Sequence, residues 1–157
     1  MAAEGFSFLL DFDPSTTWGD WLENVATIRE ASNIPIDRVP AAFLAADIDG
    51  DVVGRVSVRF ELNEFLAREG GHIGYAVLAP YRRRGYATAM LDQALDVAHG
   101  RGLDRVLIVC DAVNVASAAV IERCGGALER VVTDAAVPYS RYWIDTEHAS
   151  RRREPPG

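Results

Sequence analysis

The chain has 157 residues and a net charge of −7, and 49% of its residues are hydrophobic. This length and balance are typical of one soluble globular domain with a single core. The negative charge argues against a nucleic-acid partner and favours a cationic one such as an amine, although an acidic surface also simply aids solubility.

Arg supplies all sixteen basic residues, because the sequence contains no Lys. Schiff-base and pyridoxal phosphate enzymes need a Lys amine, and a Walker P-loop needs its Lys on the phosphates, so these classes are excluded. Cys110 and Cys124 match no zinc spacing, and His72, His99 and His148 form no ligand pair, so we expect no metal site. We also expect a cytoplasmic protein with no membrane partner, because no apolar run approaches about 20 residues and residues 1–8 lack the pattern of a signal peptide.

The first third of the chain predicts a short strand, a helix and a β-hairpin. Residues 6–10 read as a strand, and apolar residues recur at helical spacing between Trp18 and Ile28. Residues 41–48 and 52–60 predict two strands around a turn at 49–51. The face of the second strand that carries Arg55, Ser57 and Arg59 is expected to be the wetter one.

The middle of the chain predicts a strand, a helix and a second strand. After a polar connector at 61–70, residues 72–78 form a strand and 86–99 a helix with one apolar stripe. The unbroken apolar run 106–110 suits a central strand that is covered on both faces. This unit is expected to be a right-handed crossover that joins parallel strands.

The last third predicts a helix at 115–123 and strands at 128–133 and 139–144, and the Tyr142-Trp143-Ile144 edge could pair with a second chain in a homodimer. We expect one domain over residues 1–148 and a flexible tail over 149–157.

The segment most informative about function is Tyr81-Arg82-Arg83-Arg84-Gly85-Tyr86-Ala87-Thr88, between a predicted strand and a predicted helix. Gly85 lets the backbone turn and approach a ligand, and the first amides of a helix lack internal acceptors. Together with the arginines, these amides would hold a pyrophosphate. The same run could instead be a solvated charge cluster at the start of an ordinary helix.

Arg82-x-x-Gly85-x-Ala87 after a strand resembles the Gln/Arg-x-x-Gly-x-Gly/Ala motif of the GCN5-related N-acetyltransferases (GNAT). The resemblance runs from about residue 71 to 129 and includes Asn114 and Ser117 after the next strand. It implies a mixed α/β (α+β) fold: a mostly antiparallel sheet with one parallel, splayed strand pair flanked by helices. It also implies an N-acetyltransferase that moves the acetyl group of acetyl-coenzyme A to a primary amine of a small molecule or peptide, by direct attack in a ternary complex.

The resemblance assigns a set of residues to coenzyme A, with the phosphates on the loop and the pantetheine arm between the two central strands. These residues are Ala76, Val77, Leu78, Arg82, Arg83, Arg84, Gly85, Tyr86, Ala87, Thr88, Asn114 and Ser117. A backbone N–H near Ala76 or Val77 would face the thioester oxygen.

Three residues could take the proton of the attacking amine: Glu61, His72 and Asp111, of which we favour Glu61. Many family members place a Tyr seven residues after the Asn as an acid for the thiolate, but here that position is Ile121. This departure supports one alternative, a catalytically silent acyl-coenzyme A sensor. A separate alternative is an α/β domain that binds another phosphorylated ligand. The acceptor amine itself is not readable from the sequence.

Overall fold

The computed structural model describes residues 13, 15–30 and 38–147, so the strand expected at residues 6–10 lies outside the described residues. Helix α1 spans Trp18–Arg29, and the hydroxyl of Thr17 caps it by accepting from the Asp20 N–H at 3.2 Å. The helix predicted between Trp18 and Ile28 is thereby confirmed.

Strands β1 (Ala41–Ile48) and β2 (Asp51–Arg59) form the predicted antiparallel hairpin. Asp49 and Gly50 both have positive φ, of 54° and 92°, which a tight two-residue hairpin turn requires. Strand β3 (Ile73–Val77) pairs antiparallel with β2 and completes a three-stranded sheet in the order β1-β2-β3.

The predicted polar connector contains a short helical segment, Leu66–Gly70, which corrects the expectation of an irregular loop. Two contacts explain it: Asn63 Oδ1 accepts from the Leu66 N–H at 2.9 Å, and the Leu66 side chain is buried. The guanidinium of Arg141 also donates to the carbonyls of Ala67 and Arg68, at 2.7 and 2.6 Å.

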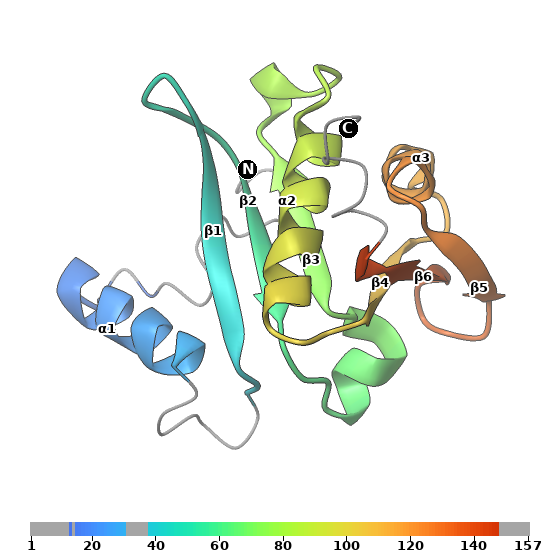
Figure 1. Cartoon of the computed structure of the whole chain (residues 1–157), viewed down its shortest axis with the longest axis horizontal. Helices are drawn as coiled ribbons and strands as arrows, with labels where there is room; N and C mark the ends of the chain where they lie inside the picture. The colour runs from blue at the N-terminus through green and yellow to red at the C-terminus, as the bar shows by residue number, and fades with distance from the viewer. Residues whose placement is uncertain (1–12, 14, 31–37, 148–157) are drawn as a thin grey trace, which may run out of the picture.

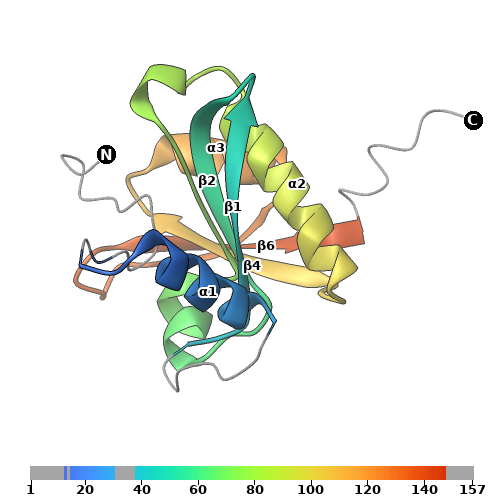
Figure 2. The ribbon, with the colours of Figure 1, turned by 90° about the vertical axis from the view of Figure 1, so that its left-hand side faces the viewer.

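A 3₁₀ turn, Ala79–Tyr81, leads to helix α2 (Tyr86–Gly100), which packs on β2 and β3. The buried side of α2 largely matches the predicted stripe and consists of Met90, Leu91, Ala94, Leu95 and Ala98. Figure 2 shows α2 on one side of the β1–β2 hairpin and α1 mostly on the other, near the open end of the hairpin.

The second half of the chain forms strand β4 (Arg105–Asp111), helix α3 (Val115–Arg123), and strands β5 (Ala127–Val132) and β6 (Tyr139–Asp145). These strands make a second antiparallel sheet in the order β4-β6-β5. Figure 1 shows this sheet and α3 on the opposite side of β3 from the β1–β2 hairpin.

Strand β6 lies between β4 and β5, so the segment Tyr142-Trp143-Ile144, expected to be an open edge, is already paired: Tyr142 and Trp143 with both strands and Ile144 with β4. The strand order places the latest strand in the middle, and that order follows from tertiary packing rather than from local sequence pattern. The homodimer therefore stays a prediction, and this segment no longer supports it.

The expected parallel strand pair does not form a ladder in the described residues. Strands β3 and β4 belong to different sheets, and the backbone bond that joins them runs from the His72 N–H to the Leu107 carbonyl at 2.7 Å. The run 106–110 is covered on both faces at Val106, Leu107 and Ile108, as predicted, but it lies in the second sheet.

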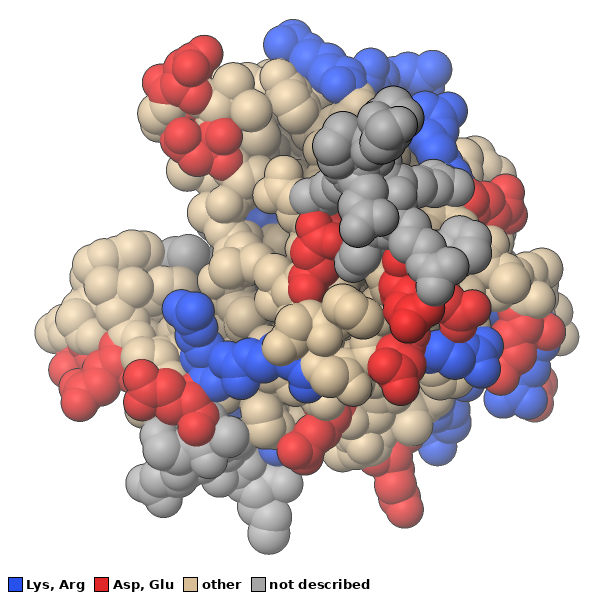
Figure 3. Space-filling model, viewed as in Figure 1, with Lys and Arg blue, Asp and Glu red and all other residues tan. Residues whose placement is uncertain are grey.

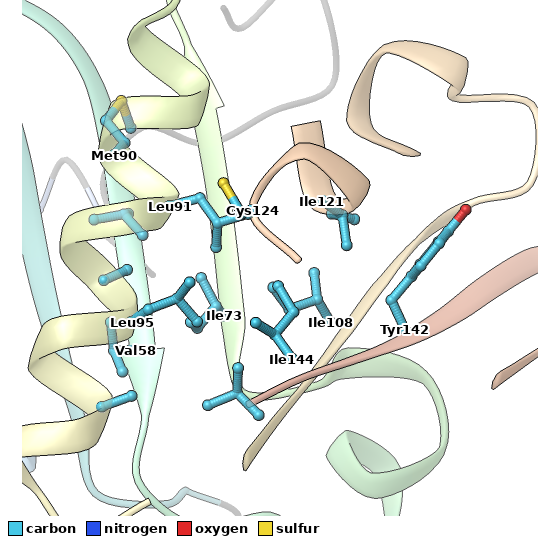
Figure 4. Packing of buried hydrophobic residues seen from close by; sticks show 14 of the residues in the cluster. Val58, Ile73, Met90, Leu91, Leu95, Ile108, Ile121, Cys124, Tyr142 and Ile144 are labelled. Atoms are coloured by element: carbon cyan, nitrogen blue, oxygen red, sulfur yellow. The ribbon is translucent and has the colours of Figure 1, made fainter. Parts of the chain in front are cut away.

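The core connects the two sheets through α2 and α3. Figure 4 shows side chains from both sheets and both helices directed toward one another; they include Val58, Ile73, Leu91, Leu95, Ile108, Ile121, Cys124 and Ile144. This packing holds β3 against α2 and α3 and so positions the loop between β3 and α2. Among the described residues, no helix combines the length and apolar character needed to cross a membrane.

Candidate active site

The loop before α2 has a backbone shape that only a few residues adopt readily. Arg83 and Gly85 both lie in the left-handed region, with φ of 62° and 84°. A β-carbon placed on Gly85 would have no atom within 4 Å, so the space beside it is open. Gly85 is therefore required for its conformation and leaves room for a ligand close to the backbone.

The start of α2 presents amides without acceptors. The first helical bond runs from the Ala89 N–H to the Gly85 carbonyl, at 3.1 Å, and no side chain caps the helix. Within the described part of the chain, the N–H groups of Gly85, Tyr86, Ala87 and Thr88 donate to no other residue. Their partial positive charge, at the end of a 15-residue helix, favours an anion there.

Three exposed arginines, Arg82 to Arg84, directly precede these amides in the chain, and two of them have contacts of their own. Arg82 Nε donates to the Val77 carbonyl at 3.0 Å, which fastens the loop to the end of β3. Arg84 lies over the Tyr81 ring, 5.8 Å from its centroid. Figure 3 shows positive charge gathered at this end of the molecule, above the start of α2.

Alternate amides of β3 face away from the first sheet. Arg59 N donates to the His72 carbonyl and Leu78 N to the Val53 carbonyl, so the register bonds Gly74, Ala76 and Leu78 to β2. The intervening N–H groups, of Tyr75 and Val77, point toward β4, and in the described residues neither has an acceptor. Of the three residues at the end of β3 and directly after it that are predicted to meet the pantetheine arm, Val77 has the unused donor, whereas the N–H groups of Ala76 and Leu78 bond to β2.

Tyr75 and Ser117 meet between β3 and α3. Their hydroxyl oxygens are 2.8 Å apart, and burial raises the pKa of Tyr75 to about 12. Tyr75 is therefore a neutral hydroxyl that can donate a hydrogen bond. Asn114, predicted with Ser117 to lie near the pantetheine arm, caps α3 by accepting from the Ser117 N–H at 3.0 Å.

Ile121 occupies the position where many family members carry a tyrosine, and it is completely buried in the core. Cys124, one turn further along, is also buried, and its Sγ makes a long contact of 3.7 Å to the Thr88 carbonyl. The pairing of Tyr75 with Ser117 was not predicted, because it joins residues 42 positions apart and no local pattern encodes it.

The structure does not bring the three candidate bases together. Glu61 is exposed just beyond the end of β2, and His72 is buried at the adjacent start of β3. Asp111 lies four residues beyond Leu107, the neighbour of His72, which places it about 13 Å further along its strand.

His72 is held in a structural bond. Its Nδ1 accepts from the Leu107 N–H at 2.8 Å, and burial is the main cause that lowers its pKa. The imidazole is therefore neutral with its proton on Nε2, where it is a donor rather than a base.

In the described residues, no group of three His, Cys, Asp or Glu side chains could hold a metal ion. Burial raises the pKa of the Cys110 thiol, so it is not a ready nucleophile. The site thus consists of backbone donors, arginines and hydroxyls, a set that suits the binding of phosphate and carbonyl oxygens.

Residues 9–126 match the sequence model of the acetyltransferase (GNAT) family, which covers most of the chain. The chain belongs to the GNAT family. It is accordingly an acetyltransferase by family, and the resemblance noted in residues 71–129 is confirmed over a longer stretch.

Solved structures share this GNAT fold at low sequence identity. A putative acetyltransferase from Salmonella typhimurium, yncA, with its cofactor acetyl-CoA, has a TM-score of 0.63 at 14% identity, over 92% of this chain and 83% of that chain. The microcin C7 self-immunity acetyltransferase MccE, in complex with acetyl-CoA and AMP, has a TM-score of 0.60 at 20% identity, over 81% of this chain and 68% of that chain.

A spermidine N-acetyltransferase from Vibrio cholerae, in complex with CoA and spermine, has a TM-score of 0.62 at 16% identity, over 88% of this chain and 81% of that chain. No curated protein matches the chain in sequence. The mixed α+β fold is thus that of GNAT acetyltransferases.

Proposed function

We propose that this GNAT protein transfers the acetyl group of acetyl-coenzyme A to a primary amine of a small molecule or peptide, by direct attack while both substrates are bound. The observation that carries this proposal is the row of four N–H groups at Gly85 to Thr88 that have no acceptor among the described residues, next to the strand β3 whose β4-facing N–H groups are likewise unused there. The presence of a spermidine N-acetyltransferase among the similar structures supports an amine acceptor.

The residues of the loop fit a pyrophosphate. Gly85, Tyr86, Ala87 and Thr88 supply backbone donors, and the exposed guanidinium of Arg83 adds positive charge at the same place. Gly85 keeps the approach to these donors open, because it has no side chain and no neighbouring atom fills the space.

The edge of β3 fits an extended amide-containing arm and a thioester. The N–H groups of Tyr75 and Val77 lie on the side of the strand that faces β4, where the two strands are not paired. When bound, acetyl-coenzyme A supplies an activated acyl group whose oxygen becomes negative during attack. A donor from Tyr75 or Val77 would stabilise that oxygen, and such a donor typically contributes about 3–4 kcal/mol.

Proton transfer needs a base for the amine and a donor near the departing sulfur. Alkyl amines are mostly protonated near pH 7, and we assign the base to Glu61, the exposed carboxylate beside the end of β2. Tyr75 keeps its proton at neutral pH, so its hydroxyl can donate to a developing thiolate where Ile121 cannot.

The site is tested by Gly85→Glu with Gly102→Glu as its matched control. Both glycines have nearly the same φ, 84° and 83°, and both have open space at the β-carbon, but they lie at opposite ends of α2. Each substitution should cost about 1 kcal/mol of stability through backbone strain. Only Gly85→Glu should weaken coenzyme A binding, by at least about tenfold in calorimetry, because it places a negative charge at the phosphates.

If the two variants bind coenzyme A with equal affinity, residues 85–88 do not form the phosphate site. The wild-type protein is then assayed for thiol release with a panel of amines. Tight coenzyme A binding without release for any amine would identify a silent sensor, and preference for ATP or NAD over coenzyme A would identify a different phosphorylated ligand.

A further inference from the structure

Two arginines lie on the face of β2 that turns away from α2. Val56 and Val58 pack in the core against α2, so the alternating residues Arg55, Ser57 and Arg59 occupy the other face. This face was predicted to be wet, but Ser57 is buried and both arginines are half-buried. The two positive charges are therefore enclosed by the fold rather than spread on an open surface.

A groove of about 240 Å³ lies on this face, between α1, β1 and the connector after β2. Its polar lining consists of Arg38, Arg59 and Asn63, and its apolar lining includes Ile28, Phe43 and Leu66. Among the residues that the structure describes, no Asp or Glu lines the groove. In a chain with a net charge of −7, this is a local site of positive charge.

Arg59 keeps most of its donors available. Its Nη1 donates to the Gly71 carbonyl at 3.2 Å, and within the described residues it forms no ion pair with a carboxylate. Burial and the nearby charge of Arg55 both lower the pKa of Arg59, and no carboxylate of the described residues offsets these two effects. An arginine stays protonated in proteins, so an anionic ligand is the natural partner for the remaining N–H groups.

The residues between Arg59 and the β4-facing edge of β3 have small side chains, so they leave space for a ligand. Gly74 and Ala76 are the β3 residues that share the arginine face, and a β-carbon placed on Gly74 would lie 3.8 Å from Arg59 Nη1. The free N–H groups of Tyr75 and Val77 begin one to three residues beyond Gly74, about 3–10 Å along the strand. A small molecule could therefore reach Arg59 with one end and the proposed thioester position with the other.

We propose that the acceptor is an amine of amino-acid size that carries a carboxylate, and that Arg59 binds this carboxylate from the groove. The inference rests on the proposed acetyl transfer and adds the substrate class. It reverses the expectation from net charge, because the groove selects for a negative group beside the amine rather than for a polycation.

The test is thiol release from acetyl-coenzyme A with α-, β- and γ-amino acids, each compared with its amide and its decarboxylated amine. The wild-type protein should prefer the carboxylate form of at least one set. Arg59→Gln should raise the KM for that amino acid by about 10- to 100-fold and abolish the preference, because a charged hydrogen bond is lost. Arg59→Lys should recover part of the loss, and the KM for acetyl-coenzyme A should stay unchanged in both variants.

Arg130→Gln, at an exposed position on β5, is the matched control and should behave as wild type. Equal or better rates with decarboxylated amines, or an unchanged preference in Arg59→Gln, would overturn the inference while the acetyl transfer stands. If no acceptor in the panel reacts but coenzyme A binds, the binding of the amino acids to the coenzyme A complex is measured by calorimetry. Binding that Arg59→Gln abolishes would support the inference, and no binding of any amino acid would overturn it. Failure to bind coenzyme A at all would instead count against the proposed function.

Discussion

At the scale of single residues, the sequence predicts the turn at Gly85, but it does not predict the hydrogen-bond partners of the polar side chains. A glycine between arginines and a helix start predicts a backbone turn followed by unpaired amides; Gly85 is left-handed, and the amides that follow have no acceptor in the described part of the chain. His72 was a candidate base by residue type, yet its Nδ1 is occupied by the backbone of Leu107, 35 positions away. Long-range partners of this kind depend on tertiary packing, and no spacing rule predicts them.

Glu61→Gln is expected to lower kcat by at least about 100-fold and to leave the KM for acetyl-coenzyme A unchanged, because the variant cannot take the proton of the amine. Glu64→Gln is the matched control, since Glu64 is another exposed carboxylate of the same connector. The measurement is the pH profile of kcat for both variants with the best acceptor. A near-normal rate for Glu61→Gln would show that another group, or water, accepts the proton.

At the scale of elements, hydrophobic periodicity predicted α1, the β1–β2 hairpin, α2 and the buried β4. It failed where a single polar residue decides the structure: the segment 61–70 reads as polar, but Asn63 caps a helical turn and Leu66 anchors it in the interior. It also failed for strand order, since the sequence pattern of β6 does not reveal that two other strands flank it.

The contact between β3 and β4 should make stability depend on pH through His72. Burial, reinforced by the charge of Arg59, holds the pKa of His72 below its value in the unfolded chain, about 6.5. Below that pH the unfolded state binds more protons than the folded state. The free energy of unfolding should therefore fall as the pH drops through about 6.5 toward 5.

His72→Asn should reduce this dependence, because the amide oxygen of Asn can accept from the Leu107 N–H but does not titrate. Urea denaturation of both proteins at pH 7.5, 6.5 and 5.5 measures the effect as the difference between their slopes with pH. Identical slopes would mean that His72 titrates alike in the folded and unfolded states.

At the scale of the whole molecule, packing against α2 and α3 holds the two sheets together. Direct hydrogen bonding between strands of the two sheets contributes little. A ligand that contacts the start of α2 and the free edge of β3 would slow backbone opening at both places. Saturating coenzyme A should slow hydrogen exchange at Gly85 to Thr88 and at Tyr75 and Val77. The N–H groups of Ala76 and Leu78, which already bond to β2, should change little.

The measurement is residue-resolved exchange by NMR with and without coenzyme A, and ATP as the comparison ligand. Protection confined to the loop residues with both ligands would contradict binding along β3. Protection of Tyr75 and Val77 with coenzyme A alone would support it.

Arg141 links distant parts of the chain in a way that bears on how this protein could acquire new substrates. Its buried guanidinium binds Glu129 of β5 through Nε and the carbonyls of Ala67 and Arg68 through Nη1. The segment that carries Leu66, one wall of the groove, is thus anchored to the far sheet. If the groove binds the acceptor as proposed, we expect substitutions near Glu129 to change acceptor selectivity without any change in the residues that line the groove, so variants with new specificity should be sought there as well as beside Arg59.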